Sequence, residues 1–372
     1  MKKMGFGFMR LPLADANDQK SIDIEELKKM VDLFMERGFT YFDTAWMYHD
    51  HCSENTLKTV LVDRYPRDRF TVATKMPVMF LKNREEQESI FKEQQRKCGL
   101  DFFDYYMLHA LNAEYYETAK RFDSFAFIRK KKEEGSIGKI GFSYHDNAEL
   151  LDNILEEHPE VDFVQLQINY LDWDNDGIQS RKCYEVARKH NKPIIVMEPV
   201  KGGTLAAVPE EVETLFKACR PDLSVTSWAI RFTAGLEGVD MVLSGMSNMA
   251  QLADNISYME NFESLSAPEH EILGRAKEII NATIAIPCTA CRYCEGDCPQ
   301  NISVSTYFSL YNAHVLDANK LWSVQKSYYQ NFTKKFGKAS DCIECGQCEA
   351  HCPQHIEIMA SLKLVAEAFE GS

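Results

Sequence analysis

Eight of the twelve cysteines fall into two copies of one spacing near the C-terminal end of the chain. Each copy reads C-x2-C-x2-C-x3-C, and a proline follows the last cysteine. The first copy is Cys288, Cys291, Cys294 and Cys298, and the second is Cys342, Cys345, Cys348 and Cys352. Three thiolates at this spacing can surround one face of an iron–sulfur cubane. We therefore expect two [4Fe–4S] clusters, each of which exchanges single electrons.

The spacing also predicts how the two runs share the clusters. Such runs are typical of bacterial two-cluster ferredoxins, in which the fourth cysteine binds the cluster of the other run. The expected ligand sets are Cys288, Cys291, Cys294 with Cys352, and Cys342, Cys345, Cys348 with Cys298. A zinc site would leave the third cysteine of each run without a role. A disulfide framework is typical of small secreted domains, and this chain has 372 residues.

The segment between the two runs is helical in character. Residues 303–336 contain neither glycine nor proline and predict two helices. This arrangement resembles the helical ferredoxin modules of larger redox enzymes more than a small ferredoxin.

A second group of residues, earlier in the chain, could carry acid–base chemistry. Asp43, Lys75 and His109 lie at the ends of three apolar runs, and Tyr48 follows closely after Asp43. A tyrosine hydroxyl has a pKa of about 10, and a neighbouring ammonium group lowers it. We expect Asp43 to hold Lys75 charged beside Tyr48, and His109 to orient a carbonyl oxygen. A surface lysine or a capping aspartate would be the ordinary explanation for any one of them.

Alternating apolar runs and helical patterns must position these side chains. The apolar runs cover residues 4–9, 40–45, 70–75, 102–110, 138–143, 162–169, 193–199 and 240–245. Asp23 and Glu26 predict a capping box at the first helix, which Gly38 ends. Eight strands with intervening helices predict a (β/α)8 TIM barrel. A doubly wound sheet is the alternative, but the turn after the first run lacks its glycine fingerprint.

A chain of 372 residues is long enough for two domains. The apolar runs and the cysteine runs predict a barrel at residues 1–262, a helical linker at 263–287 and a small, mainly helical cluster domain at 288–372. The net charge of −14 argues against a nucleic-acid partner. No apolar run is long enough to span a membrane. The four remaining cysteines follow no pairing pattern and are expected to be reduced, as in a cytoplasmic protein.

Several segments of residues 4–262 resemble the aldo-keto reductase family, and the C-terminal module resembles its iron–sulfur-containing branch. The segments are FDTAWMY (42–48), ATK (73–75), LH (108–109), GFGFMRLP (5–12), SENTL (53–57), IGFS (140–143) and VQLQINYLD (164–172). The resemblance implies an NAD(P)H-dependent barrel enzyme. In it Tyr48 is the general acid, Lys75 and Asp43 tune the tyrosine, and His109 orients the substrate.

The resemblance also implies contacts to the nicotinamide cofactor. Ser143 and Gln165 would hold the carboxamide. The remaining contacts would be Val200, Lys201, Gly202 and Gly203 at the pyrophosphate, and Gly245, Ser247, Gln251 and Asn255 at the adenosine. Trp46, Met47 and His49 flank Tyr48 and are expected to line the pocket for an aromatic or apolar carbonyl compound.

The chain departs from the family pattern at the cofactor site. Tyr144 stands where an asparagine usually binds the carboxamide, and Met197 where an aromatic ring usually stacks on the nicotinamide. Gly245 and Gln251 replace the basic residues that usually bind the 2′-phosphate. Phosphate recognition without a cation loses charge-assisted hydrogen bonds, so the choice between NADP and NAD stays open.

Joining the two parts leaves three interpretations, because nicotinamides transfer two electrons as hydride and each cluster passes one. The clusters could be structural or regulatory, or they could carry electrons from a donor to the barrel. Alternatively, the barrel is a docking scaffold for an electron-transfer subunit. Five lysines and no acid occur between residues 320 and 340. They could steer an acidic ferredoxin or flavodoxin, although a solvated helix face explains them equally well.

Overall fold

The computed structural model describes residues 2–16, 18–174, 178–282, 285–288, 292, 294–296, 298–316, 324–352 and 355–371. The chain divides into two compact units. The first comprises residues 1–202 and 217–270, and the second comprises residues 203–216 and 271–372.

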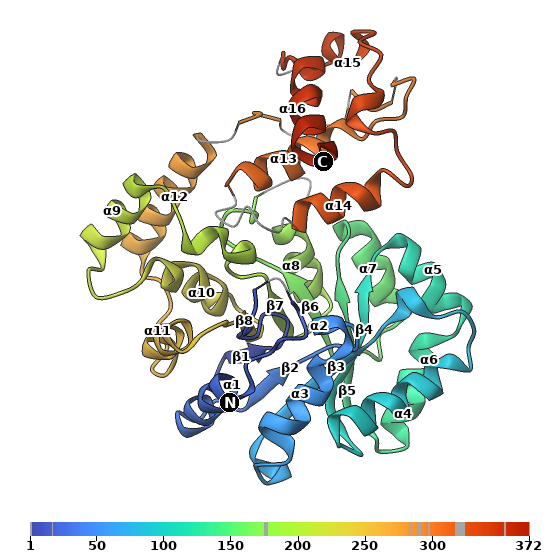
Figure 1. The fold of residues 1–372 in the computed structure, drawn as a ribbon, viewed down its shortest axis with the longest axis vertical. Helices are drawn as coiled ribbons and strands as arrows, with labels where there is room; N and C mark the ends of the chain where they lie inside the picture. The colour runs from blue at the N-terminus through green and yellow to red at the C-terminus, as the bar shows by residue number, and fades with distance from the viewer. Residues whose placement is uncertain are drawn as a thin grey trace. The chain divides into compact units, whose positions relative to one another are not determined.

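Parallel strands in the first unit close into a barrel, in which β1 pairs with β2 and also with β8. The strands are β1 (Met4–Gly7), β2 (Tyr41–Asp43), β3 (Thr71–Met76), β4 (Phe103–Leu111), β5 (Ile137–Tyr144), β6 (Phe163–Gln167), β7 (Ile194–Met197) and β8 (Val239–Gly245). Each strand coincides with one of the apolar runs, so the predicted TIM barrel is confirmed. Figure 1 shows the strands at the centre of this unit with helices around them.

Helices follow the strands along the chain. They are α1 (Ile24–Glu36), α2 (Tyr48–His51), α3 (Ser53–Leu57), α4 (Glu86–Cys98), α5 (Ala113–Arg121), α6 (Ser124–Glu133), α7 (Ala148–Glu157), α8 (Ser180–Lys189), α9 (Glu210–Cys219), α10 (Val225–Gly235), α11 (Met249–Met259) and α12 (Ala267–Ala282). Short 3-10 helices, η3 (Val78–Phe80) and η4 (Lys201–Ala206), follow β3 and β7.

The first helix begins and ends where the sequence predicts, with one difference at its start. The Asp23 side chain accepts a hydrogen bond from the Glu26 N–H at 3.0 Å. The Asp23 N–H donates to the Pro12 carbonyl at 2.9 Å and not to Glu26, so only half of the predicted capping box forms. Gly38 follows the helix with φ +77°, a conformation that favours glycine. The start of α1 is therefore tied to the loop that follows β1.

The interior of the barrel is filled by side chains at alternate strand positions. Its buried cluster consists of Tyr41, Ala73, Met107, Phe163, Ile195, Met241 and Leu243. Burying a large apolar side chain stabilises the fold by roughly 1.5–3 kcal/mol. This layer closes the barrel below the carboxyl ends of the strands, where a TIM barrel holds its active site.

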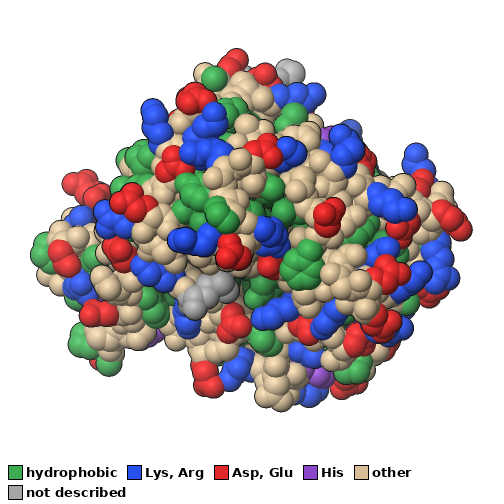
Figure 2. All heavy atoms as spheres, turned by 90° about the horizontal axis from the view of Figure 1, so that it is seen from below, with side chains coloured by type: hydrophobic (Ala, Val, Ile, Leu, Met, Phe, Trp, Pro, Cys, Tyr) green, Lys and Arg blue, Asp and Glu red, His purple; other side chains and the backbone are tan. Residues whose placement is uncertain are grey.

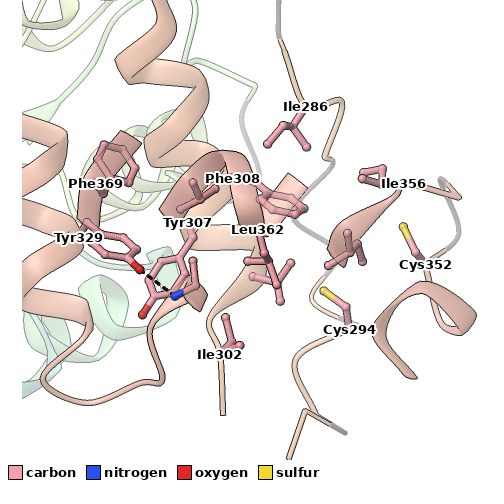
Figure 3. Packing of buried hydrophobic residues seen from close by; sticks show 14 residues of the cluster. Ile286, Cys294, Ile302, Tyr307, Phe308, Tyr329, Cys352, Ile356, Leu362 and Phe369 are labelled. Carbon is pink, nitrogen blue, oxygen red and sulfur yellow. Dashed lines mark hydrogen bonds between the residues drawn. The ribbon is translucent and has the colours of Figure 1, made fainter. Parts of the chain in front are cut away.

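The second unit contains the two helices predicted between the cysteine runs, α13 (Val304–Leu316) and α14 (Val324–Phe332). Two more, α15 (Gln347–Ala350) and α16 (Ile358–Glu370), follow the second run. Tyr307, Tyr329 and Phe369 pack together in its core (Figure 3). The Tyr329 hydroxyl accepts a hydrogen bond from the Ala339 N–H at 2.7 Å and donates to Glu370. These contacts connect α14 and α16 to the start of the second cysteine run.

The described helices include none that combines the length and apolar composition required for a membrane span. On the face drawn in Figure 2, lysine and arginine side chains are interspersed with aspartate and glutamate. The coloured atoms of that face therefore present no extended field of one sign.

Candidate functional site

The polar residues of the site occupy the inward positions one step above the apolar layer of the barrel. Asp43, Lys75, His109, Ser143 and Gln165 each lie two residues beyond an inward-facing position on β2 to β6. The strand register staggers them, since Asp43 pairs with Ala73 and Lys75 pairs with Met107. Side chains two residues apart on a strand point to the same face. The barrel therefore gathers these groups at the carboxyl ends of its strands.

Lys75 and Asp43 form a buried ion pair. The Lys75 Nζ lies 2.5 Å from Asp43 Oδ1, and the two residues are 1% and 3% exposed. Lys75 also donates to the Thr44 carbonyl at 2.8 Å. An ammonium group has three hydrogens, so one remains for Tyr48. Desolvation acts to lower the pKa of Lys75, but Asp43 and Tyr48 outweigh it and raise that pKa. Lys75 is therefore an ammonium ion at neutral pH.

Tyr48 lies directly above this pair. Its ring centroid is 4.9 Å from Lys75 Nζ and 5.9 Å from the centroid of the His109 ring. Burial raises the pKa of Tyr48, and this effect exceeds the lowering by Lys75. The sequence led us to expect a net lowering by the ammonium group. The hydroxyl is instead held protonated, with a cation beside it that would stabilise the tyrosinate once the proton leaves.

His109 is neutral and has a free ring nitrogen. Burial first, and the charge of Lys75 second, hold the pKa of His109 well below its usual value of 6.5. Its Nδ1 is buried and has no hydrogen-bond partner among the described residues. The register of β4 and β5 shifts between Leu108 and Leu111, and Ala110 adopts φ +56°. This irregularity lies immediately next to His109 in the strand. A buried ring nitrogen without a partner indicates a ligand position beside Tyr48.

The turn after Tyr48 is left-handed. His49, Asp50 and His51 have φ values of +51°, +48° and +70°. Such a conformation costs roughly 1–2 kcal/mol for each residue other than glycine. The His49 Nε2 accepts a hydrogen bond from the Leu11 N–H at 3.3 Å, and its Nδ1 lies 2.9 Å from the Gln19 carbonyl. The His49 ring therefore connects this turn to the loop after β1, which differs from the pocket contact expected for it.

The other predicted pocket residues lie at the rim. The Trp46 ring lies 5.7 Å from the Phe80 ring in η3 and 4.2 Å from the His51 ring. Met47 and Phe80 are 38% and 45% exposed. Exposed apolar side chains beside a polar floor suit an apolar substrate. Phe80 was missed because a single aromatic residue in a loop gives no periodic signal.

A buried polar cluster supports the end of β3. The Gln94 side-chain amide donates to the Lys75 carbonyl at 2.9 Å and to Glu54 Oε1 at 2.8 Å. Glu54 also accepts from the Thr74 hydroxyl at 2.9 Å and lies 3.2 Å from Lys97 Nζ. Sequence analysis missed this cluster. Its signal was Gln94 on the buried face of α4, where Phe91 and Cys98 also lie.

Ser143 and Gln165, the predicted carboxamide contacts, lie on the barrel floor and are 1% and 2% exposed. Ser143 Oγ accepts from the Ala110 N–H at 2.7 Å, and the Gln165 amide lies 3.3 Å from Asp43 Oδ2. Tyr144 points away from the barrel interior, and its hydroxyl donates to the Asn147 carbonyl at 2.6 Å. Tyr144 therefore takes no part in this floor.

The turn after β7 has a backbone suited to close approach by a ligand. Glu198, Lys201 and Gly202 all have positive φ, at +57°, +49° and +66°. The Lys201 ammonium lies 2.6 Å and 2.8 Å from the two carboxylate oxygens of Asp172, which is 2% exposed. The positive charge of Lys201 is therefore already balanced by the carboxylate of Asp172. Val200 is partly buried and immediately precedes it.

The predicted adenosine contacts at the start of α11 make hydrogen bonds within the protein. The Ser247 N–H donates to Gln251 Oε1 at 2.7 Å. Asn255 donates to Ser244 Oγ at 2.9 Å and accepts from the Tyr258 hydroxyl. Asn255 is 3% exposed. The side chains of Gln251 and Asn255 thus stabilise the segment between β8 and α11 by hydrogen bonds. Gly245 lies at the end of β8, just before this segment.

The second cysteine run forms a site with one cysteine of the first. Cys298, Cys342, Cys345 and Cys348 together line one cavity, whose walls include Ile302 and Leu362. These four cysteines are the ones that the spacing predicts to share one cluster. Burial raises the pKa of Cys348 to about 11. Such thiols require a bound cation to ionise, which suits an iron–sulfur cluster.

The other set is described in part, because Cys291 lies outside the described residues. Cys294 and Cys352 belong to the same buried cluster of the second unit, and Cys288 packs against it. Figure 3 shows Cys294 and Cys352 at one end of this cluster. Burial raises the pKa of Cys294 to about 12. Cys298, Cys342 and Cys348 pack against the same cluster, which therefore gathers cysteines of both runs without separating the two sets.

Family models match most of the chain. The Aldo/keto reductase family model matches residues 3–278, and a 4Fe-4S dicluster domain model matches residues 287–357. An aldo-keto reductase from Mycobacterium avium (strain 104) is 25% identical over 247 residues, which cover 66% of this chain and 79% of the relative. One from Mycolicibacterium smegmatis is 24% identical over 169 residues, covering 42% of this chain and 57% of the relative.

Solved structures have a similar fold. Aldo-keto reductase AKR11C1 from Bacillus halodurans gives a TM-score of 0.57 at 21% identity, covering 74% of this chain and 91% of that chain. An aldo-keto reductase from Klebsiella pneumoniae, solved in complex with NADPH, gives 0.57 at 17% identity, covering 73% and 90%. Together with the family models, these matches agree with the barrel fold. The chain belongs to the aldo/keto reductase family and carries a C-terminal 4Fe-4S dicluster domain.

Proposed function

We propose that this chain is an oxidoreductase that reduces a carbonyl compound with NAD(P)H, using Tyr48 as the general acid. One observation carries the proposal: Tyr48 lies beside both the buried Lys75–Asp43 pair and His109, whose Nδ1 has no hydrogen-bond partner among the described residues. A proton donor, a cation and a neutral hydrogen-bonding group thus converge on one position. This combination suits the reduction of a carbonyl oxygen to a hydroxyl group.

The residues would divide the reaction as follows. Bound NAD(P)H supplies a hydride to the carbonyl carbon. The Tyr48 O–H bond breaks and its proton goes to the carbonyl oxygen, which gives the alcohol. The Lys75 ammonium stabilises the tyrosinate left behind, and Asp43 keeps Lys75 charged and in place. Solvent then returns the proton to Tyr48, so that the site is restored.

His109 would orient the substrate. A neutral imidazole N–H can donate a hydrogen bond to the carbonyl oxygen without competing with Tyr48 for the proton. The low pKa of His109 favours this neutral form. The rim residues Trp46, Met47 and Phe80 would bind an aromatic or apolar substituent of the substrate.

The residues of the barrel floor fit a nicotinamide cofactor. Ser143 uses an acceptor position for Ala110 and keeps its hydroxyl hydrogen available for the carboxamide. The turn at Val200, Lys201, Gly202 and Gly203 is proposed to hold the pyrophosphate. Gly245, Ser247, Gln251 and Asn255 are proposed to shape the adenosine pocket. The NADPH bound to the Klebsiella pneumoniae structure supports NADP as one cofactor to test.

We assign two [4Fe–4S] clusters to the crossed cysteine sets. Each cluster would pass one electron at a time, whereas the barrel site moves two electrons as hydride. The clusters are therefore proposed to be an accessory part, for electron transfer or for structure. A scaffold barrel that only docks an acidic ferredoxin or flavodoxin is the alternative, and it predicts no dependence of turnover on Tyr48.

Replacing Tyr48 by phenylalanine tests the proposal, with Tyr184→Phe as the matched control. Tyr184 is a half-buried tyrosine on α8 whose hydroxyl donates to the Glu237 carbonyl at 2.9 Å. General acid catalysis contributes roughly 10²- to 10⁴-fold, so Tyr48→Phe should lower kcat for carbonyl reduction by that factor. Tyr184→Phe should retain activity, and both variants should retain their iron. Unchanged turnover in Tyr48→Phe would refute the role of Tyr48.

A further inference from the structure

The loop after β1 brings a cation to the turn that is proposed to hold the cofactor pyrophosphate. Arg10 lies in this loop, within the segment GFGFMRLP. The stem of Arg10 packs on Gly245 at the end of β8. An added Cβ at Gly245 would lie 3.0 Å from Arg10 Cβ and 3.3 Å from its Cδ. The absence of a side chain at residue 245 therefore makes room for the stem of Arg10.

The head of Arg10 points toward the β7 turn. A Cβ built on Gly202 would lie 3.4 Å from an Arg10 guanidinium nitrogen. The Arg10 carbonyl accepts a hydrogen bond from Ser247 Oγ at 3.4 Å, which connects this loop to the segment before α11. Gly202, Gly245 and Ser247 were each expected to contact the cofactor. Arg10 lies among all three.

The Arg10 guanidinium keeps N–H donors available for a ligand, whereas the Lys201 ammonium does not. Lys201 is held by both oxygens of Asp172. Among the residues that the structure describes, the guanidinium of Arg10 makes one loose ion pair, at 3.9 Å from Glu198. The Arg10 and Glu198 side chains are 39% and 32% exposed. A guanidinium group has five N–H donors in a planar fork that suits phosphate oxygens. It can therefore face Glu198 and a phosphate together.

We propose that Arg10 is the residue that binds the pyrophosphate of the nicotinamide cofactor, an inference that rests on the proposed function above. Arg10 would supply a positive charge at the turn after β7, where Lys201 is already paired with Asp172. Because its head lies at Gly202 and only its stem lies at Gly245, it contacts the pyrophosphate and not the 2′-phosphate. Arg10 therefore strengthens the binding of both NADPH and NADH. Residues other than Arg10 determine which of the two cofactors is preferred.

Dissociation constants for NADPH, NADH and ADP-ribose test this assignment on the full chain with its clusters intact. Arg10→Met removes the charge and keeps the length of the stem, and Arg10→Lys keeps a charge without the fork. Arg37→Ala is the control, since it removes an arginine whose ion pair with Glu260 is 3.1 Å long. Charge-assisted hydrogen bonds suggest a loss of roughly 10- to 100-fold for all three ligands in Arg10→Met. Arg10→Lys should fall between Arg10→Met and the wild type.

The outcomes separate this inference from the function on which it rests. A loss confined to NADPH would show that Arg10 reads the 2′-phosphate, and would overturn the assignment. Affinities within twofold of the wild type for all three ligands would also overturn it, while leaving the proposed function intact. A wild-type chain that binds neither dinucleotide would refute both. Arg37→Ala should bind all three ligands as the wild type does, with the same melting temperature.

Discussion

At the scale of single residues, environment decides what each group of the barrel floor can do. The ion pair between Lys75 and Asp43 replaces the hydration that both groups lose in this almost fully buried site. Removing one partner of such a pair leaves the other charge buried and costs roughly 3–5 kcal/mol. The pair is therefore a demanding arrangement for structure alone. The position of the pair beneath Tyr48 supports the role proposed for it.

The state of His109 makes a prediction about pH. Its pKa is held well below 6.5 by burial and by Lys75, so it binds a proton only in distinctly acidic solution. The pKa of Tyr48 is raised, so its hydroxyl stays protonated through neutral and mildly alkaline pH. The profile of kcat/KM for carbonyl reduction should therefore show no inflection near pH 6.5. An acidic loss of activity with an apparent pKa near 6.5 would mean that His109 titrates as an exposed histidine does.

The candidate acid–base residues were predicted from the sequence, but their neighbours were not. Asp43, Lys75 and His109 could be recognised because each ends an apolar run, and the ends of parallel strands meet in a barrel. The network of Glu54, Gln94 and Lys97 could not, because its members come from two helices whose packing no local pattern fixes. The role of His49 was also missed, since its partners in the loop after β1 are distant in sequence.

At the scale of elements, the strands were predictable because each is a short apolar run between turn or helix signals. The helix caps were less predictable than the strands. The missing half of the capping box at α1 arises because the Asp23 N–H finds the Pro12 carbonyl in a loop. The left-handed turn after Tyr48 also had no signal, because it contains no glycine. Tertiary contacts stabilise it, and they appear only once the barrel has closed.

The two cysteine runs are elements that are predicted to exchange their fourth ligands. The cavity that Cys298 lines together with Cys342, Cys345 and Cys348 supports this crossing. Cys298→Ser should therefore remove one of two clusters, as Cys342→Ser should, and Cys298→Ser/Cys342→Ser should lose no more than either single variant. Iron content and the electron paramagnetic resonance of the reduced protein measure this loss.

Two further variants sharpen that comparison. Cys298→Ser/Cys294→Ser should lose both clusters, because the crossed sets place these two cysteines on different ones. Cys219→Ser changes a cysteine outside both runs and should keep the full iron content. Retention of one cluster in Cys298→Ser/Cys294→Ser would mean that each run binds its own cluster without crossing.

At the scale of the whole molecule, the proposed function combines two kinds of electron chemistry. The family model places an aldo/keto reductase barrel at residues 3–278, and the dicluster model follows at residues 287–357. The barrel floor offers a proton donor with a cation to stabilise its conjugate base, which suits hydride transfer to a carbonyl. The cysteine sets suit single-electron carriers. We expect the barrel reaction to proceed by hydride transfer, without electrons drawn through the clusters.

The fate of the hydrogen at C4 of the nicotinamide shows directly whether the barrel transfers a hydride. The full chain, with its clusters intact and under anaerobic conditions, would be given NADPH or NADH carrying deuterium at both C4 positions, together with an aromatic carbonyl compound. Hydride transfer predicts one deuterium on the carbinol carbon of each alcohol formed. The rate of this deuterium incorporation should fall in Tyr48→Phe together with turnover. Alcohol formed without deuterium, with the carbinol hydrogen taken from solvent, would contradict hydride transfer.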